Sequence, residues 1–228
     1  MARYTPEQVA RTIDHAVLKP EFTTADVEHH AAMCRARGVY SMCVRPCDVA
    51  LAAELLRDSG VLVSVVVGFP HGHARPEVKA LEAQLAIADG AREVDMVMNV
   101  GRFLSGDDEA VKADIAAVVA VARPAGVLVK VILETAYLTL EQVAHACLLA
   151  EAAGADFVKT STGFAPGAAT PEIVDVMLKE IGGRLKIKPS GGIRTWATAV
   201  GYLDQGVDRL GVGSTEAVLD GGAADGDY

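Results

Sequence analysis

The stretch that decides the fold is LEQVAHACLLAEAAGADFVKTSTG, residues 140–163. Its first part, residues 140–153, is rich in Ala, Leu and Glu with a helical period, and Gly154 follows the last helical turn. A short apolar run, residues 157–160, comes soon after that turn, as expected of a strand. The same helix-to-strand turn occurs earlier, in Ala88-Asp89-Gly90-Ala91-Arg92. The repeating unit is therefore one strand and one helix.

Short apolar runs alternate with longer helical stretches along the whole chain. The predicted strands are residues 12–18, 39–44, 62–67, 93–99, 128–134, 157–160, 185–188 and 209–212. The predicted helices are 24–37, 46–59, 75–89, 108–122, 140–153, 171–181 and 195–205. Eight such units predict an α/β fold, a single-domain (β/α)8 TIM barrel over residues 1–228 with a short flexible tail at 220–228. A doubly wound open sheet is disfavoured because no G-x-G-x-x-G motif follows Leu18.

Composition narrows the possible partners. The chain has 228 residues, of which 51% are hydrophobic, and a formal net charge of -9. This acidic balance gives no basic stripe for phosphates along a duplex, so we expect no nucleic-acid partner. The first residues lack the apolar segment of a secretory signal, and no apolar run is long enough to span a membrane. We therefore expect no membrane association and a cytoplasmic protein.

The cysteines and histidines do not form a metal-binding pattern. Four irregularly placed cysteines argue against a disulfide framework. Cys43 and Cys47 are spaced C-x3-C, but no second Cys or His pair follows at zinc-site spacing. His71 and His73 share one loop without a nearby carboxylate. We expect neither a metal nor another cofactor, and we interpret Cys43 as a residue that lines a pocket.

Two lysines stand at the ends of predicted strands, where catalytic groups of such barrels lie. Lys159 ends the run Phe157-Val158-Lys159, and Lys188 ends Leu185-Lys186-Ile187-Lys188. Alternation along each strand places both side chains toward the barrel interior. Burial and a neighbouring cation both favour the neutral form of an amine, and a neutral lysine can attack a carbonyl. The alternative is a lysine whose ammonium group simply reaches water.

Asp95 is the carboxylate best placed to work with these lysines. It lies in the apolar run Glu93-Val94-Asp95-Met96-Val97, where a lone carboxylate needs a cation or water as partner. Pairing with Lys188 would prepare it for proton transfer. The alternative is a side chain that faces the helix layer and pairs there. Asp14, in Ile13-Asp14-His15, shows a similar pattern.

Two glycine-rich turns follow the last two predicted strands. They are Ser190-Gly191-Gly192-Ile193-Arg194 and Gly211-Val212-Gly213-Ser214-Thr215, and each leads into a helical stretch. Glycines at these places let backbone N–H groups converge on a phosphate. The sequence therefore predicts a small phosphorylated substrate.

Several motifs together resemble the deoxyribose-phosphate aldolase family. The matching stretches are Ile13-Asp14-His15, Cys43-Val44-Arg45-Pro46, Val67-Gly68-Phe69-Pro70-His71-Gly72, Glu93-Val94-Asp95-Met96-Val97, residues 128–135, residues 154–164 and residues 188–195. They follow one another over nearly the whole chain, and the lysine stretch with the second Lys-x-x-Gly-Gly is highly specific.

The resemblance implies a role for each matching residue. Lys159 would form the Schiff base, Lys188 would be the cation that favours its neutral form, and Asp95 would act through a water. Asp14 would support the site at the first strand, and Tyr228 at the end of the tail would assist proton transfer. The expected substrate- and phosphate-binding residues are Cys43, Thr162, Gly163, Gly191, Gly192, Gly213 and Ser214.

Three positions depart from the family pattern. Gly213-Ser214 stands where many members carry two serines, which removes one hydroxyl contact to phosphate, and Thr215 is the candidate replacement. Phe164 stands where some members have a lysine near the phosphate. Ala16 replaces a frequent threonine beside the substrate.

The resemblance implies a class I aldolase that needs no cofactor and acts as a homodimer. It would cleave 2-deoxy-D-ribose 5-phosphate reversibly to D-glyceraldehyde 3-phosphate and acetaldehyde, in deoxynucleoside catabolism. One alternative is another phosphosugar enzyme such as an isomerase, with Asp95 as base and Lys159 as an electrostatic contact. A second is a catalytically silent barrel that binds a phosphosugar.

Overall fold

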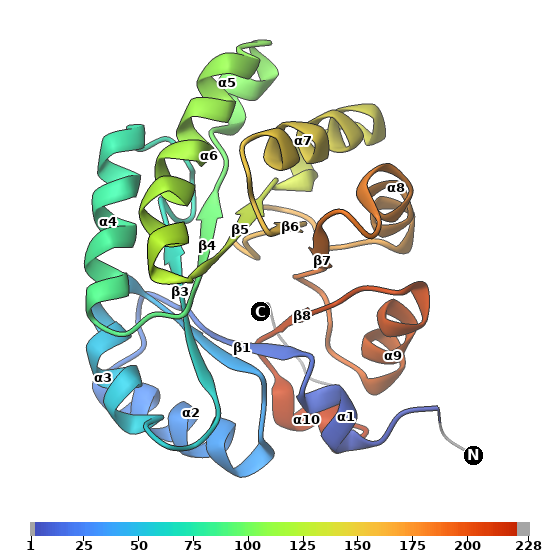
Figure 1. The fold of residues 1–228 in the computed structure, drawn as a ribbon. Coiled ribbons are helices and arrows are strands. Elements are labelled where there is room, and N and C mark those ends of the chain that lie inside the picture. Colours follow the sequence, from blue (N-terminus) through green and yellow to red (C-terminus); the bar gives the residue numbers. More distant parts are fainter. Residues whose placement is uncertain (1–2, 223–228) are drawn as a thin grey trace.

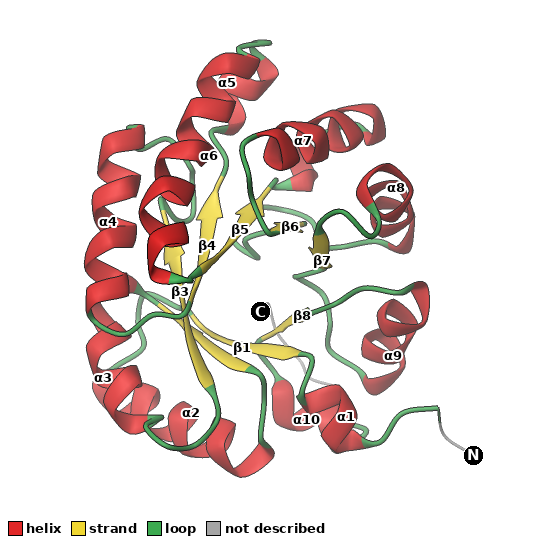
Figure 2. Ribbon diagram, viewed as in Figure 1, coloured by secondary structure: helices red, strands yellow, loops and turns green. Residues whose placement is uncertain are grey.

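The strands of the computed structural model, which describes residues 3–222, form a parallel barrel surrounded by helices (Figures 1 and 2). They hydrogen-bond in the order β7-β6-β5-β4-β3-β2-β1-β8. Between β7 and β8, the Gly211 N–H donates to the Pro189 carbonyl at 2.9 Å and the Asp208 N–H to the Ile187 carbonyl at 3.1 Å. These contacts close the ring, so the predicted (β/α)8 barrel is confirmed.

The elements of the described chain have the following bounds. The strands are β1 (Ile13–Val17), β2 (Ser41–Val44), β3 (Leu62–Val67), β4 (Glu93–Val97), β5 (Leu128–Ile132), β6 (Phe157–Lys159), β7 (Lys186–Lys188) and β8 (Leu210–Val212). The α-helices are α1 (Pro6–Ala10), α2 (Thr24–Arg37), α3 (Val49–Leu55), α4 (Pro76–Ala88), α5 (Val100–Leu104), α6 (Asp108–Ala122), α7 (Leu140–Ala152), α8 (Pro171–Ile181), α9 (Trp196–Gln205) and α10 (Thr215–Leu219). Short 3-10 helices are η1 (Pro46–Asp48), η2 (Arg123–Ala125) and η3 (Thr135–Tyr137).

Several strands are shorter than predicted because the chain turns at their carboxyl ends. The predicted strand 93–99 ends at Val97, since the Asn99 side chain accepts the Arg102 N–H and caps α5. The predicted strand 128–134 ends at Ile132, and Glu134 is left-handed with φ 53°. These turns aim the residues after the strands at the mouth of the barrel.

The predicted helix 46–59 was too long. The chain forms η1 first, with the Arg45 guanidinium 2.7 Å from Asp48, and only then α3. The helix ends at Leu55, and the backbone turns with positive φ at Asp58 and Gly60. Helices α1 and α5 were not predicted because five residues are too few for a helical period to be visible.

Apolar side chains on the outer face of the barrel pack against the helices. Ile13, Val65, Val94 and Val131 are fully buried in this layer. The inner face carries the buried Asp14, Glu93, Asp95, Lys130, Lys159 and Lys188 instead, with a small apolar cluster near its mouth made of Ala16, Leu18, Cys43, Val66 and Phe69. The site is built by the charged side chains that point from the strands into the barrel.

Within residues 3–222, no helix is long and apolar enough to cross a membrane.

Candidate active site

Asp95 lies at the centre of a buried cluster inside the barrel. Its Oδ2 accepts hydrogen bonds from Lys188 Nζ at 2.7 Å and Lys159 Nζ at 3.1 Å. Its Oδ1 accepts from Lys130 Nζ at 2.7 Å and from the Ser64 hydroxyl at 3.2 Å. The side chains of Asp95, Lys159 and Lys188 are at most 1% exposed. Asp95 therefore faces the interior and not the helix layer, and Lys159 does not reach bulk water.

Asp14 joins the same cluster from β1. Its Oδ2 accepts from Lys188 Nζ at 2.5 Å, and its Oδ1 accepts from the Ser41 hydroxyl and from the Arg209 guanidinium, both at 2.6 Å. Lys188 is thus held between two carboxylates, Asp14 and Asp95. These two contacts fix the position of the Lys188 amine. Among the described residues, Lys159 has one carboxylate partner, Asp95.

Three further charged side chains inside the barrel, Glu93, Lys130 and Arg209, contact these residues or one another. The sequence analysis did not predict them. Lys130 Nζ lies 2.6 Å from Glu93 Oε2, and Arg209 Nη1 lies 2.9 Å from the same oxygen. The Arg209 guanidinium also stacks over the Tyr40 ring, with its carbon 3.4 Å from the ring centre. The available signal was the alternation of the strands, which puts Glu93 on the same face as Asp95.

The charges of this cluster do not balance. Among the described residues it contains three carboxylates, Asp14, Glu93 and Asp95, and it contains four basic groups, Lys130, Lys159, Lys188 and Arg209. If every group is ionised, one positive charge is in excess. Within this part of the chain Lys159 pairs with a single carboxylate, whereas each of the other three cations pairs with at least two. Lys159 is therefore the basic group with the fewest carboxylate partners in the described cluster.

Asp95 and Asp14 stay ionised. Burial alone would raise the pKa of Asp95, but Lys130, Lys188 and Lys159 together hold that pKa well below its usual range. The pKa of Asp14 is likewise low, because the surrounding cations outweigh the effect of burial. Burial would lower the pKa of Lys130, but the neighbouring carboxylates raise it instead. Lys130 therefore remains a cation.

The predicted phosphate residues meet at the mouth of the barrel. Gly191, Gly192, Gly213 and Ser214 line one hollow there. Gly163 and Phe164 line the adjoining hollow, which shares Gly191, Gly192 and Arg194 with the first. Gly191 and Gly192 have φ of 82° and 76°, which favours glycine, and a Cβ on Gly192 would lie 2.9 Å from Ala168 Cβ.

Two threonines near this end bond to other protein groups, and Phe164 packs against a neighbouring ring. The predicted replacement, Thr215, is wrong: its side chain is buried, and its Oγ1 lies 2.9 Å from His15 Nδ1 behind β1. Thr162 donates its hydroxyl and its N–H to the buried Glu134 carboxylate. Phe164 packs edge-on against Phe69, with ring centres 5.2 Å apart.

The other predicted residues fall into separate places. Cys43 is buried in the small apolar cluster, where burial raises the pKa of its thiol above the usual value. His71 and His73 stack on each other, with ring centres 5.5 Å apart. Tyr228 and most of the tail lie outside the described residues. Within residues 3–222, no group of three or more His, Cys, Asp or Glu side chains could hold a metal ion.

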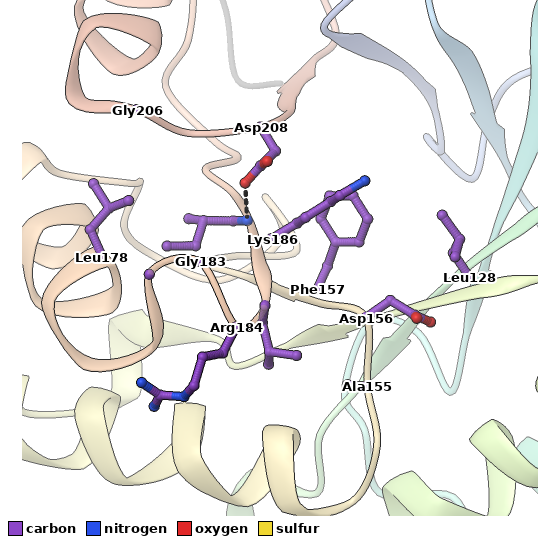
Figure 3. Close-up of a pocket in the computed structure, with 13 residues that line it drawn as sticks. Leu128, Ala155, Asp156, Phe157, Leu178, Gly183, Arg184, Lys186, Gly206 and Asp208 are labelled. Atoms are coloured by element: carbon purple, nitrogen blue, oxygen red, sulfur yellow. Dashed lines mark hydrogen bonds between the residues drawn. The ribbon is translucent and has the colours of Figure 1, made fainter.

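A cavity of about 550 Å³ lies at the opposite end of the barrel, where β5, β6 and β7 begin (Figure 3). Its lining includes Phe157, Lys186 and Asp208, and Asp208 accepts the Ile187 N–H at 2.9 Å. None of the predicted site residues lines it. Because barrel enzymes work at the carboxyl ends of their strands, we assign this cavity no part in the reaction.

Comparison with known proteins identifies the family. Residues 8–208 match the model of the DeoC/LacD family aldolases. The chain belongs to this aldolase family. Deoxyribose-phosphate aldolase 1 of Bacillus licheniformis is 46% identical over 222 residues, which cover 97% of this chain and 99% of the relative. The deoxyribose-phosphate aldolase of Mycobacterium tuberculosis is 50% identical over 222 residues, 95% of this chain and 97% of that protein.

Solved structures of aldolases have the same fold. The aldolase QR15 superposes with a TM-score of 0.89 at 37% identity, over 93% of this chain and 94% of that one. The deoxyribose-phosphate aldolase of Aeropyrum pernix, described as a tetramer, gives a TM-score of 0.88 at 33% identity, over 95% of this chain and 91% of that one. Membership of the DeoC/LacD aldolases sets aside both the isomerase and the silent binding barrel.

Proposed function

We propose that this aldolase cleaves 2-deoxy-D-ribose 5-phosphate reversibly to D-glyceraldehyde 3-phosphate and acetaldehyde, through a Schiff base on Lys159. The supporting observation is the buried charge cluster with one surplus cation, in which Lys159 has a single carboxylate partner at 3.1 Å. Loss of a proton from Lys159 would make the cluster neutral. The names of the similar proteins support the choice of substrate.

Neutral Lys159 attacks the C1 aldehyde of the open-chain sugar, and loss of water gives a protonated imine. Asp95, acting through a water and with Lys188, takes the proton of the C3 hydroxyl. The bond between C2 and C3 then breaks, and its electron pair moves into the imine to give an enamine. Protonation at C2 followed by hydrolysis releases acetaldehyde and restores the lysine amine.

The buried pairs keep these groups in position. Lys188 is held 2.5 Å from Asp14 and 2.7 Å from Asp95, so it lies beside Lys159 without being able to swing away. Lys130 holds the other oxygen of Asp95. Preorganised charges of this kind stabilise a transition state because they need no rearrangement during the reaction. Tyr228 is proposed to assist protonation of the enamine.

The phosphate is proposed to bind in the paired hollows at the barrel mouth, near Gly163, Gly191, Gly192, Gly213 and Ser214. Arg194 lines both hollows and brings a positive charge to them. Thr162 and Cys43 are proposed to contact the sugar portion. Binding energy at this remote group would contribute to the orientation of the reacting bond.

We further propose a homodimer that works in the cytoplasm, in deoxynucleoside catabolism. The four cysteines are free, as is usual for a protein of a reducing compartment. The A. pernix relative is described as a tetramer, so sedimentation of the purified protein must decide between dimer and tetramer.

Turnover tests the proposed reaction. The protein is mixed with 2-deoxyribose 5-phosphate, and release of acetaldehyde is followed with alcohol dehydrogenase and NADH. We expect NADH oxidation in proportion to enzyme, and none with Lys159→Ala. Formation of an isomeric pentose phosphate without acetaldehyde would overturn the proposal and support an isomerase.

A further inference from the structure

His15 is a buried histidine that the proposed reaction does not use. It follows Asp14 on β1, and alternation directs it outward while Asp14 points into the charge cluster. Its Nδ1 lies 2.9 Å from Thr215 Oγ1, and its Nε2 lies 2.8 Å from His30 Nδ1 on α2. Both nitrogens are therefore occupied, and the ring links β1, α2 and α10.

His15 is neutral in the folded protein. Burial, with His30 and His29 beside it, lowers its pKa to about 3. A neutral imidazole has one donor and one acceptor nitrogen, so it can bond a hydroxyl on one side and a second imidazole on the other. The link to Thr215 is thus a satisfied buried hydrogen bond that holds its two partners at a fixed distance.

Thr215 is the first residue of α10 and directly follows Gly213-Ser214, which line the proposed phosphate hollow. Within the described chain, the Ser214 side chain makes no capping hydrogen bond to α10. The bond from Thr215 to His15 is a side-chain attachment of this turn to the barrel. It joins the turn to the strand that also carries Asp14.

We propose that His15 and Thr215 are a positioning pair, which holds the Gly213–Ser214 turn in the geometry that binds the substrate phosphate. The inference rests on the proposed function, and it assigns Thr215 a role behind the turn instead of a direct phosphate contact. It predicts that loss of the pair weakens recognition of phosphate specifically, while the chemistry at Lys159 continues.

The test compares substrates with and without the phosphate. For wild type and Thr215→Val, kcat/KM is measured with 2-deoxyribose 5-phosphate and with 2-deoxyribose, and the ratio of the two values is taken. We expect Thr215→Val to lower this ratio about tenfold, chiefly through KM for the phosphorylated sugar. Thr215→Ser keeps the hydroxyl and should retain most of the ratio. Thr12→Val, which removes a hydroxyl bonded to the Val9 carbonyl before β1, is the matched control.

An unchanged ratio in Thr215→Val, or an equal fall for both substrates, would overturn the proposal. Calorimetric titration with inorganic phosphate separates it from the proposed function. Phosphate binding that weakens in Thr215→Val would support the positioning pair even if the wild type failed to release acetaldehyde. Phosphate binding equal in both proteins would refute the pair even if the aldolase reaction is correct.

Discussion

Replacing Lys188 by Met removes the positive charge beside Lys159. Both amines contact the same oxygen of Asp95, Lys159 at 3.1 Å and Lys188 at 2.7 Å, so they are at most the sum of these distances apart, 5.8 Å. Two unit charges at that separation repel each other by about 3 kcal/mol at an effective dielectric constant of about 20. Without Lys188 this repulsion disappears, and the cluster has as many cations as carboxylates.

We therefore expect Lys188→Met to disfavour the neutral, nucleophilic form of the Lys159 amine relative to the wild type. An energy of about 3 kcal/mol corresponds to about a hundredfold loss of neutral amine. The assay is the rate at which acetaldehyde and cyanoborohydride add mass to Lys159, located by peptide mass spectrometry, because this step needs only imine formation at that residue. The variant should be about a hundredfold slower at neutral pH and approach the wild type as the pH is raised.

Lys79→Met is the matched control for loss of a buried lysine. Lys79 Nζ lies 2.5 Å from Asp114 in the helix layer, outside the charge cluster. Its replacement should leave the trapping rate unchanged. Equal trapping by Lys188→Met and wild type at neutral pH, or a deficit that persists at high pH, would refute the charge argument.

Asp95→Asn should still form the imine but cleave 2-deoxyribose 5-phosphate about 10²–10⁴-fold more slowly, as expected for loss of a proton-transfer group. Imine trapping and turnover, measured on one sample, test this prediction. Equal losses of trapping and turnover would contradict it. Phe164→Lys should lower KM for the phosphorylated sugar about fivefold, the effect of about 1 kcal/mol from a partly exposed charge; steady-state kinetics will show whether KM instead stays constant. Lys79→Met should lower the free energy of unfolding by about 3–5 kcal/mol, because the buried Asp114 loses its cation; a loss below about 1 kcal/mol in urea denaturation would be inconsistent with this. Burial holds the pKa of His15 at about 3 in the folded protein, below its ordinary value of 6.5. As the pH falls below 6.5, His15 is protonated in the unfolded chain but not in the folded protein. The free energy of unfolding should therefore fall as the pH drops from 6.5 toward 3. The slope is about 1.4 kcal/mol per pH unit, and denaturation at several pH values should show it reduced in His15→Gln.

The barrel could be predicted because each unit repeats one local pattern. The strand that ends at Lys159 and the glycine turn that precedes this strand have counterparts around the chain. Alternation along the strands places Asp95 and Lys188 on inner faces. The two residues do meet, at 2.7 Å. A local pattern that repeats around a closed ring thus determines which side chains share the interior.

The rest of the site could not be predicted because it depends on contacts between distant strands. Arg209, just before β8, reaches Asp14 on β1 and Glu93 on β4 only because the barrel closes. Thr215 and His15 are likewise 200 residues apart in sequence. The direction of the Thr215 hydroxyl follows from the start of α10, a helix too short to give a periodic signal.

The most direct test of the central claim is to locate the Schiff base. The cluster contains three lysine amines, those of Lys130, Lys159 and Lys188, and each lies within 3.1 Å of Asp95. The protein is treated with 2-deoxyribose 5-phosphate and borohydride, digested, and sequenced by mass spectrometry. The charge balance predicts the reduced adduct on Lys159, whereas an adduct on Lys130 or Lys188, or none at all, would contradict it.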